Sequence, residues 1–171
     1  MIDLKDYIRD IQDFPKPGVL FKDITPLLGD KEASLECLNQ LLKKVGNQPI
    51  DKVVGIDARG FFFGTLLAQA LNAGFVPVRK AGKLPSGTHK EPYSLEYGMD
   101  ALEIHEDAIA PGERVLIHDD VLATGGTARA ACNLVKKCGG EVVQCNFIMQ
   151  LNFLNGKDKL RQYEIASLME F

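Results

Sequence analysis

The sequence has 171 residues, of which 46% are hydrophobic and 25% charged, and its formal net charge at pH 7 is -3. This length suits one domain with a sizeable core, and the composition is that of an ordinary globular protein. The negative net charge argues against a nucleic-acid partner, because nucleic-acid-binding surfaces usually carry a positive excess. We expect a single domain over residues 1–171 and no nucleic-acid partner.

No stretch approaches the ~20 apolar residues that a membrane span needs, so no membrane partner is expected. The first residues alternate charged and apolar side chains and lack the apolar run of a signal peptide. No two of the four cysteines form a CxxC pair, which predicts reduced, partly buried thiols and a cytoplasmic protein. The cysteines are Cys37, Cys132, Cys138 and Cys145.

Apolar residues recur at helical spacing in some segments and in short runs typical of buried strands in others. Their alternation predicts an α/β fold with a mainly parallel sheet flanked by helices. Residues 82–98 are polar, contain prolines and glycines, and predict a mobile loop. In chain order, the predicted elements are a helix near 4–11, a helix over 31–44, a strand at 53–56, a helix over 61–73, strands at 75–78, 101–107 and 115–118, a helix over 125–137, and strands at 141–150 and 164–169.

The most informative segment is 115–127, where an apolar strand leads into two adjacent acids, a loop of small residues and a helix. Adjacent acids can address one ligand only where the strand ends and the chain turns, since side chains alternate along a regular strand. Backbone N–H groups at a helix N-terminus favour a phosphate. The carboxylates would repel that phosphate unless they bind something else, and the paired hydroxyls of a ribose are suitable donors.

This order of features predicts a ribose-phosphate site, although each feature alone would also fit solvated acids followed by a glycine turn. There is no GxxxxGK[ST], and no GxGxxG follows a strand, which disfavours P-loop and dinucleotide binding. The candidate ribose and 5′-phosphate residues are Asp119, Asp120, Ala123, Thr124, Gly125, Gly126 and Thr127.

Residues 119–127 resemble the phosphoribosyl-pyrophosphate motif of the type I phosphoribosyltransferases. Segments 14–28, 55–61, 79–85 and 93–98 resemble further segments of the adenine branch of that family, in the family order. The resemblance implies the type I phosphoribosyltransferase fold, with an N-terminal base-binding hood over 1–30 and a mobile catalytic loop over 82–98. It also implies purine salvage, in which the phosphoribosyl group of phosphoribosyl pyrophosphate is transferred to adenine, giving AMP and pyrophosphate.

The resemblance further implies contacts for the pyrophosphate and the purine. A Mg²⁺ ion held mainly by the substrate would accompany the pyrophosphate, since Mg²⁺ prefers hard oxygen ligands. The purine would stack between two apolar side chains, while main-chain groups read its edge. The implied pyrophosphate residues are Asp57, Ala58, Arg59, Arg79, Lys80 and Lys83, and the implied adenine residues are Leu20, Phe21, Lys22 and Leu151.

By the same resemblance, Glu96 would shuttle the purine proton and Tyr97 would take part in loop closure, which excludes water. A homodimer is implied by the family alone. Without the resemblance, Phe21 and Leu151 would be read as core residues and Glu96 as a solvated acid. His118 stands where the family usually has an apolar residue, and we expect it to be packed behind the acids rather than to bind substrate.

Two alternatives remain open at this point. The enzyme could act on hypoxanthine, guanine or xanthine, which the segment 20–22 argues against. The chain could instead be a non-catalytic ribose-phosphate sensor, against which we count the presence of Glu96, Arg59 and Lys83 and the absence of a spare domain.

Overall fold

The computed structural model describes residues 2–94 and 98–171, and the chain forms two compact units, Met1–Gln40 and Leu41–Phe171. The first unit begins with a single 3-10 turn, η1 (Leu4–Tyr7), in which the Asp3 carboxylate accepts a hydrogen bond from Lys5 N. An antiparallel pair follows, β1 (Arg9–Gln12) and β2 (Leu20–Asp23), with Ile11 opposite Phe21. The predicted helix near 4–11 is therefore confined to the 3-10 turn of residues 4–7, because residues 9–12 pair with β2 instead of continuing the helix.

Two helices complete the first unit and lead into the second: α1 (Thr25–Gly29) and α2 (Lys31–Val45). The predicted helix over 31–44 is confirmed. Asp30 begins it in the usual way, since Oδ1 of Asp30 accepts hydrogen bonds from the N–H groups of Glu32 and Ala33.

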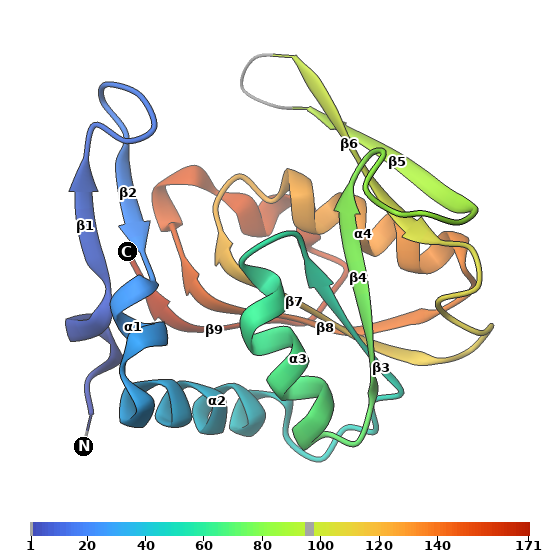
Figure 1. Ribbon diagram of the computed structural model, residues 1–171, viewed down its shortest axis with the longest axis horizontal. Coiled ribbons are helices and arrows are strands. Elements are labelled where there is room, and N and C mark those ends of the chain that lie inside the picture. Colours follow the sequence, from blue (N-terminus) through green and yellow to red (C-terminus); the bar gives the residue numbers. More distant parts are fainter. Residues whose placement is uncertain (1, 95–97) are drawn as a thin grey trace. The chain divides into compact units, whose positions relative to one another are not determined.

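The second unit is built on a seven-stranded sheet in the order β5-β6-β4-β3-β7-β8-β9 (Figure 1). Strands β4, β3, β7, β8 and β9 are parallel neighbours, whereas β6 and β5 are added antiparallel beyond β4. The prediction of a mainly parallel α/β sheet is confirmed. The strands are β3 (Lys52–Ile56), β4 (Gly74–Lys80), β5 (Thr88–Ser94), β6 (Met99–His105), β7 (Arg114–Leu122), β8 (Glu141–Gln150) and β9 (Ile165–Glu170).

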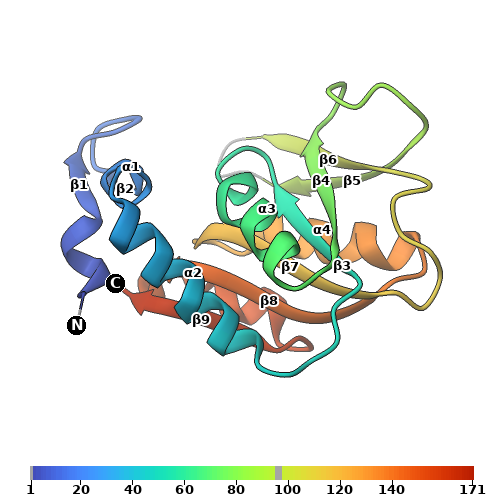
Figure 2. The ribbon, with the colours of Figure 1, turned by 60° about the horizontal axis from the view of Figure 1, so that its bottom comes forward.

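Helices α3 (Gly60–Ala70) and α4 (Gly126–Lys137) lie on opposite faces of this sheet (Figures 1 and 2). The buried face of α4 packs on the strands through small and branched side chains such as Ala131, Cys132 and Val135. Two short 3-10 segments, η2 (Asn152–Leu154) and η3 (Gly156–Leu160), connect β8 to β9 and were not predicted.

Two strand predictions need correction. Residues 88–94, expected to belong to a loop, form β5, which pairs with β6 from Thr88 opposite His105 to Ser94 opposite Met99. Its alternating polar residues gain ladder hydrogen bonds from a partner that the segment itself does not reveal. The strand expected at 115–118 continues to Leu122, because β8 pairs with it as far as Gln150.

All four cysteines are buried and free, in agreement with the predicted reduced thiols. No helix within residues 2–94 and 98–171 is both long enough and apolar enough to cross a membrane.

Candidate active site

The candidate site lies where the chain order of the parallel strands reverses. β3 is paired with β4 on one side and with β7 on the other, so the carboxyl ends of β3 and β7 are adjacent. The loop that enters α3 and the loop that enters α4 leave from this same edge (Figure 2). A reversal of this kind opens a crevice between the two loops, which is the usual ligand site of open α/β sheets.

Asp119 and Asp120 lie within β7 and not beyond its end, which corrects the expectation that the chain turns there. Their side chains point to different surroundings: Asp119 lines a pocket at the strand end, whereas Oδ2 of Asp120 lies 2.7 Å from Arg59 Nε. The two acids are still linked, because Asp120 N donates to Asp119 Oδ1 over 2.9 Å.

Burial is the main cause that raises the pKa of both carboxyls. The neighbouring Asp120 charge raises the pKa of Asp119 further, well above its usual value. For Asp120, the Arg59 guanidinium opposes the effect of burial. Both carboxyls are therefore costly to ionise, and Asp119 more so, because Asp120 already has the Arg59 guanidinium beside it.

His118 precedes these acids and is fully buried, with Nδ1 2.7 Å from Asn146 Oδ1. Burial lowers its pKa to about 4, so the ring is neutral at physiological pH. The expectation of a packed histidine is confirmed.

The loop after β7 forms a small pocket of about 60 Å³ at the N-terminus of α4. Gly125 has a φ of 78°, and a Cβ there would collide with the carbonyl oxygen of Gly156. A Cβ on Gly156 would in turn meet the carbonyl oxygen of Ala123. The backbones around Gly125 and Gly156 therefore lie in direct contact beside this pocket, an approach that leaves no room for a Cβ at either residue. The pocket is lined by Asp119, Val121, Leu122, Ala123, Thr124, Gly125, Thr127 and Ala128.

The loop after β3 carries the second candidate segment, and its Asp57–Ala58 peptide bond is cis. The Asp57 carboxylate is 3.2 Å from both Arg79 Nε and Lys83 Nζ. Burial opposes ionisation of Asp57, but the hydrogen bonds and charges of Lys83 and Arg79 outweigh it and lower the pKa. Asp57 thus holds two cations, which fits a carboxylate that organises an anion site rather than one that touches the anion.

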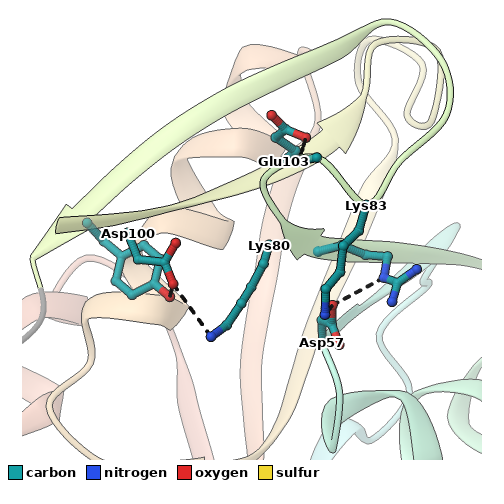
Figure 3. Close-up of polar contacts among 8 residues, drawn as sticks. Asp57, Lys80, Lys83, Asp100 and Glu103 are labelled. Carbon is teal, nitrogen blue, oxygen red and sulfur yellow. Dashed lines mark hydrogen bonds and ion pairs between the residues drawn. The ribbon is translucent and has the colours of Figure 1, made fainter.

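Lys80 follows Arg79 in β4 and takes the other face of the sheet. Its Nζ lies 3.6 Å from Oδ2 of Asp100 at the start of β6, whereas Lys83 extends to Asp57 (Figure 3). Tyr93 of β5 stands opposite Asp100, and its hydroxyl donates to the same Oδ2 over 3.3 Å. Asp100 and Tyr93 were not predicted as site residues, since their connection to Lys80 depends on strand pairing.

The remaining predicted residues are only partly described. Leu20, Phe21 and Lys22 lie on β2 of the first unit, where the Phe21 ring meets Phe14 edge-on with centroids 5.1 Å apart. Leu151 belongs to the second unit and lines a pocket beyond β8, which Asn155 and Lys157 also line. Glu96 and Tyr97 lie outside the described residues.

A metal would find few protein ligands here. Within residues 2–94 and 98–171, no group of three or more His, Cys, Asp or Glu side chains is arranged to hold an ion. Asp57 is engaged by two cations and Asp120 by Arg59. These residues fit a Mg²⁺ ion whose ligands come chiefly from a bound substrate.

Comparisons with known proteins agree with this geometry. Residues 28–165 match the model of the phosphoribosyl transferase domain. The chain is 62% identical, over 99% of both sequences, to adenine phosphoribosyltransferase of Christiangramia forsetii. Among solved structures, it resembles adenine phosphoribosyltransferase of Rhodothermus marinus with a TM-score of 0.95 and 53% identity, covering 98% of this chain and 96% of that one.

A third comparison includes ligands. The chain resembles adenine phosphoribosyltransferase of Saccharomyces cerevisiae with a TM-score of 0.87 and 40% identity, covering 97% of this chain and 95% of that one. That structure holds adenine together with an imino-altritol bisphosphate.

Proposed function

This chain belongs to the adenine phosphoribosyltransferase family, and from that premise we propose how its residues divide the reaction among them. The enzyme transfers the phosphoribosyl group of 5-phosphoribosyl-1-pyrophosphate to adenine, giving AMP and pyrophosphate in purine salvage. The alternatives of another purine and of a non-catalytic sensor are set aside by the near full-length similarity.

The observation that carries the assignment of roles is the pair Asp119–Asp120 beside the pocket of the loop after β7. The 5′-phosphate binds the N–H groups of residues 123–127, where the start of α4 favours an anion. The ribose diol then lies against the two carboxylates, and its hydroxyls donate to the ionised form, which offsets the cost of burying that charge. Binding of the phosphate and the diol orients C1 for displacement.

At C1 the bond to the pyrophosphate oxygen breaks while the bond to adenine N9 forms, and positive charge develops on the ring. The ionised carboxylates stabilise that charge, which is greater in the transition state than in the bound substrate. Pyrophosphate leaves with the bonding electron pair. Its negative charge is met by Arg59, Arg79, Lys80 and Lys83 and by backbone groups of residues 57–58.

Mg²⁺ belongs to this proposal as a companion of the pyrophosphate. When bound, it neutralises phosphate charge and so makes pyrophosphate a better leaving group. In this proposal Asp119 and Asp120 serve the diol rather than a protein cage for the ion.

For the base, we propose that Phe21 and Leu151 form the two apolar walls and that main-chain groups of Leu20 and Lys22 read the adenine edge. Glu96 accepts or donates the purine proton, and Tyr97 helps the surrounding segment to close over the sugar. The residues 1–30 act as the hood of one catalytic domain that spans residues 1–171. These roles rest on the family motifs in the sequence.

A cytoplasmic homodimer completes the proposal. Phe62 and Leu66 stand one turn apart on α3 with 47% and 43% of their surfaces exposed, which supports an apolar contact with a second copy. The four free, buried cysteines support a reducing compartment.

The roles are tested by measuring pyrophosphate release from phosphoribosyl pyrophosphate and Mg²⁺ with adenine, guanine, hypoxanthine and xanthine in parallel. We expect release with adenine alone, accompanied by AMP. Asp119→Asn/Asp120→Asn should lose both turnover and tight binding of the sugar phosphate. The control is Asp107→Asn, which removes an exposed acid in the turn after β6. An inactive double variant that still binds the sugar phosphate normally would contradict the role of the two acids.

A further inference from the structure

Three residues on three strands form a chain of contacts on one face of the sheet: Lys80 on β4, Asp100 on β6 and Tyr93 on β5. Lys80 is opposite Leu102, two residues from Asp100, and Tyr93 is directly opposite Asp100. Since residues two apart in a strand and directly paired residues share a face, all three side chains point the same way. They lie on the face that α4 covers, because α4 packs against both β5 and β6.

The ion pair between Lys80 and Asp100 is loose. The distance of 3.6 Å is longer than the 3.2 Å between Lys83 and Asp57, and 56% of the Lys80 side chain is exposed. Such a pair contributes little on its own, since water screens it and the long side chain loses freedom in it. Lys80 can therefore move to a stronger anion nearby.

Asp100 remains well bound without the lysine. Its Oδ1 accepts from Ala101 N over 2.8 Å, and its Oδ2 accepts from the Tyr93 hydroxyl. The pKa of Asp100 is lowered by the backbone N–H of Ala101 first, with Lys80 and Tyr93 as smaller causes, so departure of Lys80 leaves the carboxylate ionised. Burial, and then the Asp100 charge, raise the pKa of Tyr93 to about 12, so its hydroxyl remains a donor.

Tyr93 also lies beside the loop that follows β7, since it lines the same pocket as Gly126. A Cβ on Gly126 would be 3.8 Å from Cδ2 of Tyr93 and 3.6 Å from the Ser94 carbonyl oxygen, which places the ring beside the start of α4. Tyr93 thus lies between the start of α4 and the pair formed by Asp100 and Lys80.

We propose that Asp100 and Tyr93 are positioning residues for Lys80, and that Lys80 exchanges the Asp100 carboxylate for the pyrophosphate group when substrate binds. Asp100 holds the ammonium at the edge of the site before binding. The Tyr93 hydroxyl donates a hydrogen bond to Oδ2 of Asp100, and this bond weakens the attraction of that oxygen for the Lys80 ammonium. This inference rests on the proposed role of Lys80 as a pyrophosphate contact.

The exchange predicts opposite effects from two small changes. Asp100→Asn removes the competing charge, so pyrophosphate with Mg²⁺ should bind about two- to fivefold more tightly. Tyr93→Phe keeps the ring but removes the donor, so Asp100 should hold Lys80 more strongly and pyrophosphate should bind about two- to fivefold more weakly. A merely structural role would weaken binding in both variants. Isothermal titration calorimetry on the full chain measures both dissociation constants.

The Lys80→Met background separates exchange from other causes. If Asp100 and Tyr93 act through Lys80, both effects should vanish when Lys80 is absent. Glu91→Gln is the matched control, because Glu91 lies on β5 two residues from Tyr93 and pairs with Lys137 at 2.7 Å instead of with Lys80. Glu91→Gln also removes a negative charge, and any change in pyrophosphate affinity that it causes should be the same with and without Lys80.

Equal effects of Asp100→Asn in the presence and absence of Lys80, or weaker binding in that variant, would overturn the exchange. If Lys80→Met alone leaves pyrophosphate binding unchanged, Lys80 is not a pyrophosphate contact, and the exchange fails together with that role. This result differs from an effect of Asp100→Asn that persists without Lys80, which overturns the exchange alone. Melting temperatures of all variants identify any that are merely misfolded.

Discussion

The Nε atom of Arg59 lies 2.7 Å from Oδ2 of Asp120, so the residue before α3 supplies the counter-charge for a carboxylate within β7. Gly60 makes this approach feasible, because a Cβ there would be only 2.8 Å from the His118 carbonyl oxygen and 3.1 Å from Asp119 Oδ1. The loop that we propose to bind the pyrophosphate is thereby in direct contact with the acids that we propose to bind the ribose.

The first prediction concerns that counter-charge. Burial raises the pKa of Asp120 and the Arg59 charge opposes it, so Arg59→Met should raise the pKa further. Fewer enzyme molecules then carry the ionised pair at a given acidic pH. The acid limb of the kcat/KM profile should move to higher pH, and by less in Arg59→Lys. An unmoved acid limb with uniformly lower activity would mean that Arg59 acts on the substrate alone.

The second prediction concerns the stability that the folded protein loses when the buried carboxyl of Asp119 ionises. The folded-state pKa of Asp119 is raised, so the unfolded chain gives up this proton at lower pH than the folded chain does. Asp119 therefore lowers stability progressively as pH rises from about 4 towards the folded-state pKa, and remains destabilising at neutral pH. Asp119→Asn should raise the melting temperature at pH 7 by about 2–4 °C while activity falls. The melting temperature is measured by calorimetry from pH 4 to 8, and a variant no more stable than wild type at pH 7 would refute the prediction.

The third prediction compares two neighbouring glycines. Gly125→Ala places a Cβ against the Gly156 carbonyl at a positive φ, and we expect a loss of about 2 kcal/mol or more in unfolding free energy and of 5′-phosphate affinity. Gly126→Ala should keep wild-type stability, since the nearest atom to a Cβ there is 3.6 Å away. Urea unfolding gives the stabilities. Equal stabilities of the two variants would show that the loop adjusts to the side chain.

The fourth prediction uses the buried histidine. Burial lowers the pKa of His118 to about 4, while in the unfolded chain it titrates near ~6.5. Protons therefore bind the unfolded state preferentially, and stability is lost as pH falls from about 6.5 towards 4. By pH 5 this loss should be about 2 kcal/mol.

His118→Gln should not show this loss, because glutamine does not titrate and can still bond with Asn146. The difference between the two stability curves from pH 7 to 5 isolates the histidine from the nearby acids. Parallel curves would mean that His118 is not the group responsible.

The central elements could be predicted because their signals are local. Apolar runs mark β3 and β7, helical spacing marks α2 and α4, and the acids, small residues and helix of 119–127 occur in one continuous segment. The candidate carboxylates and the candidate phosphate-binding loop could be proposed from that segment alone.

Other features could not be read from local patterns. β5 forms from polar residues because β6 pairs with it along its whole length. β7 extends through both acids because β8 pairs with it beyond them. Strand register brings Asp100 opposite Tyr93. Gly156 packs directly against the loop after β7, from which it is separated by about thirty residues in the sequence. Each of these features depends on a partner segment that the spacing of polar and apolar residues within the segment itself does not identify.

Arg79 and Lys80 are consecutive residues of β4, yet their side chains lie on opposite faces of the sheet. Arg79 forms an ion pair with Asp57, and Lys80 forms one with Asp100. One residue inserted before Arg79, or one deleted, would exchange the two cations between faces, because side chains alternate with a period of two. The spacing between Gly74 and Lys80 is thus as much a part of the proposed anion site as the charges themselves. A change of two residues would restore the faces but shift both cations along the strand by about 7 Å, away from their partners.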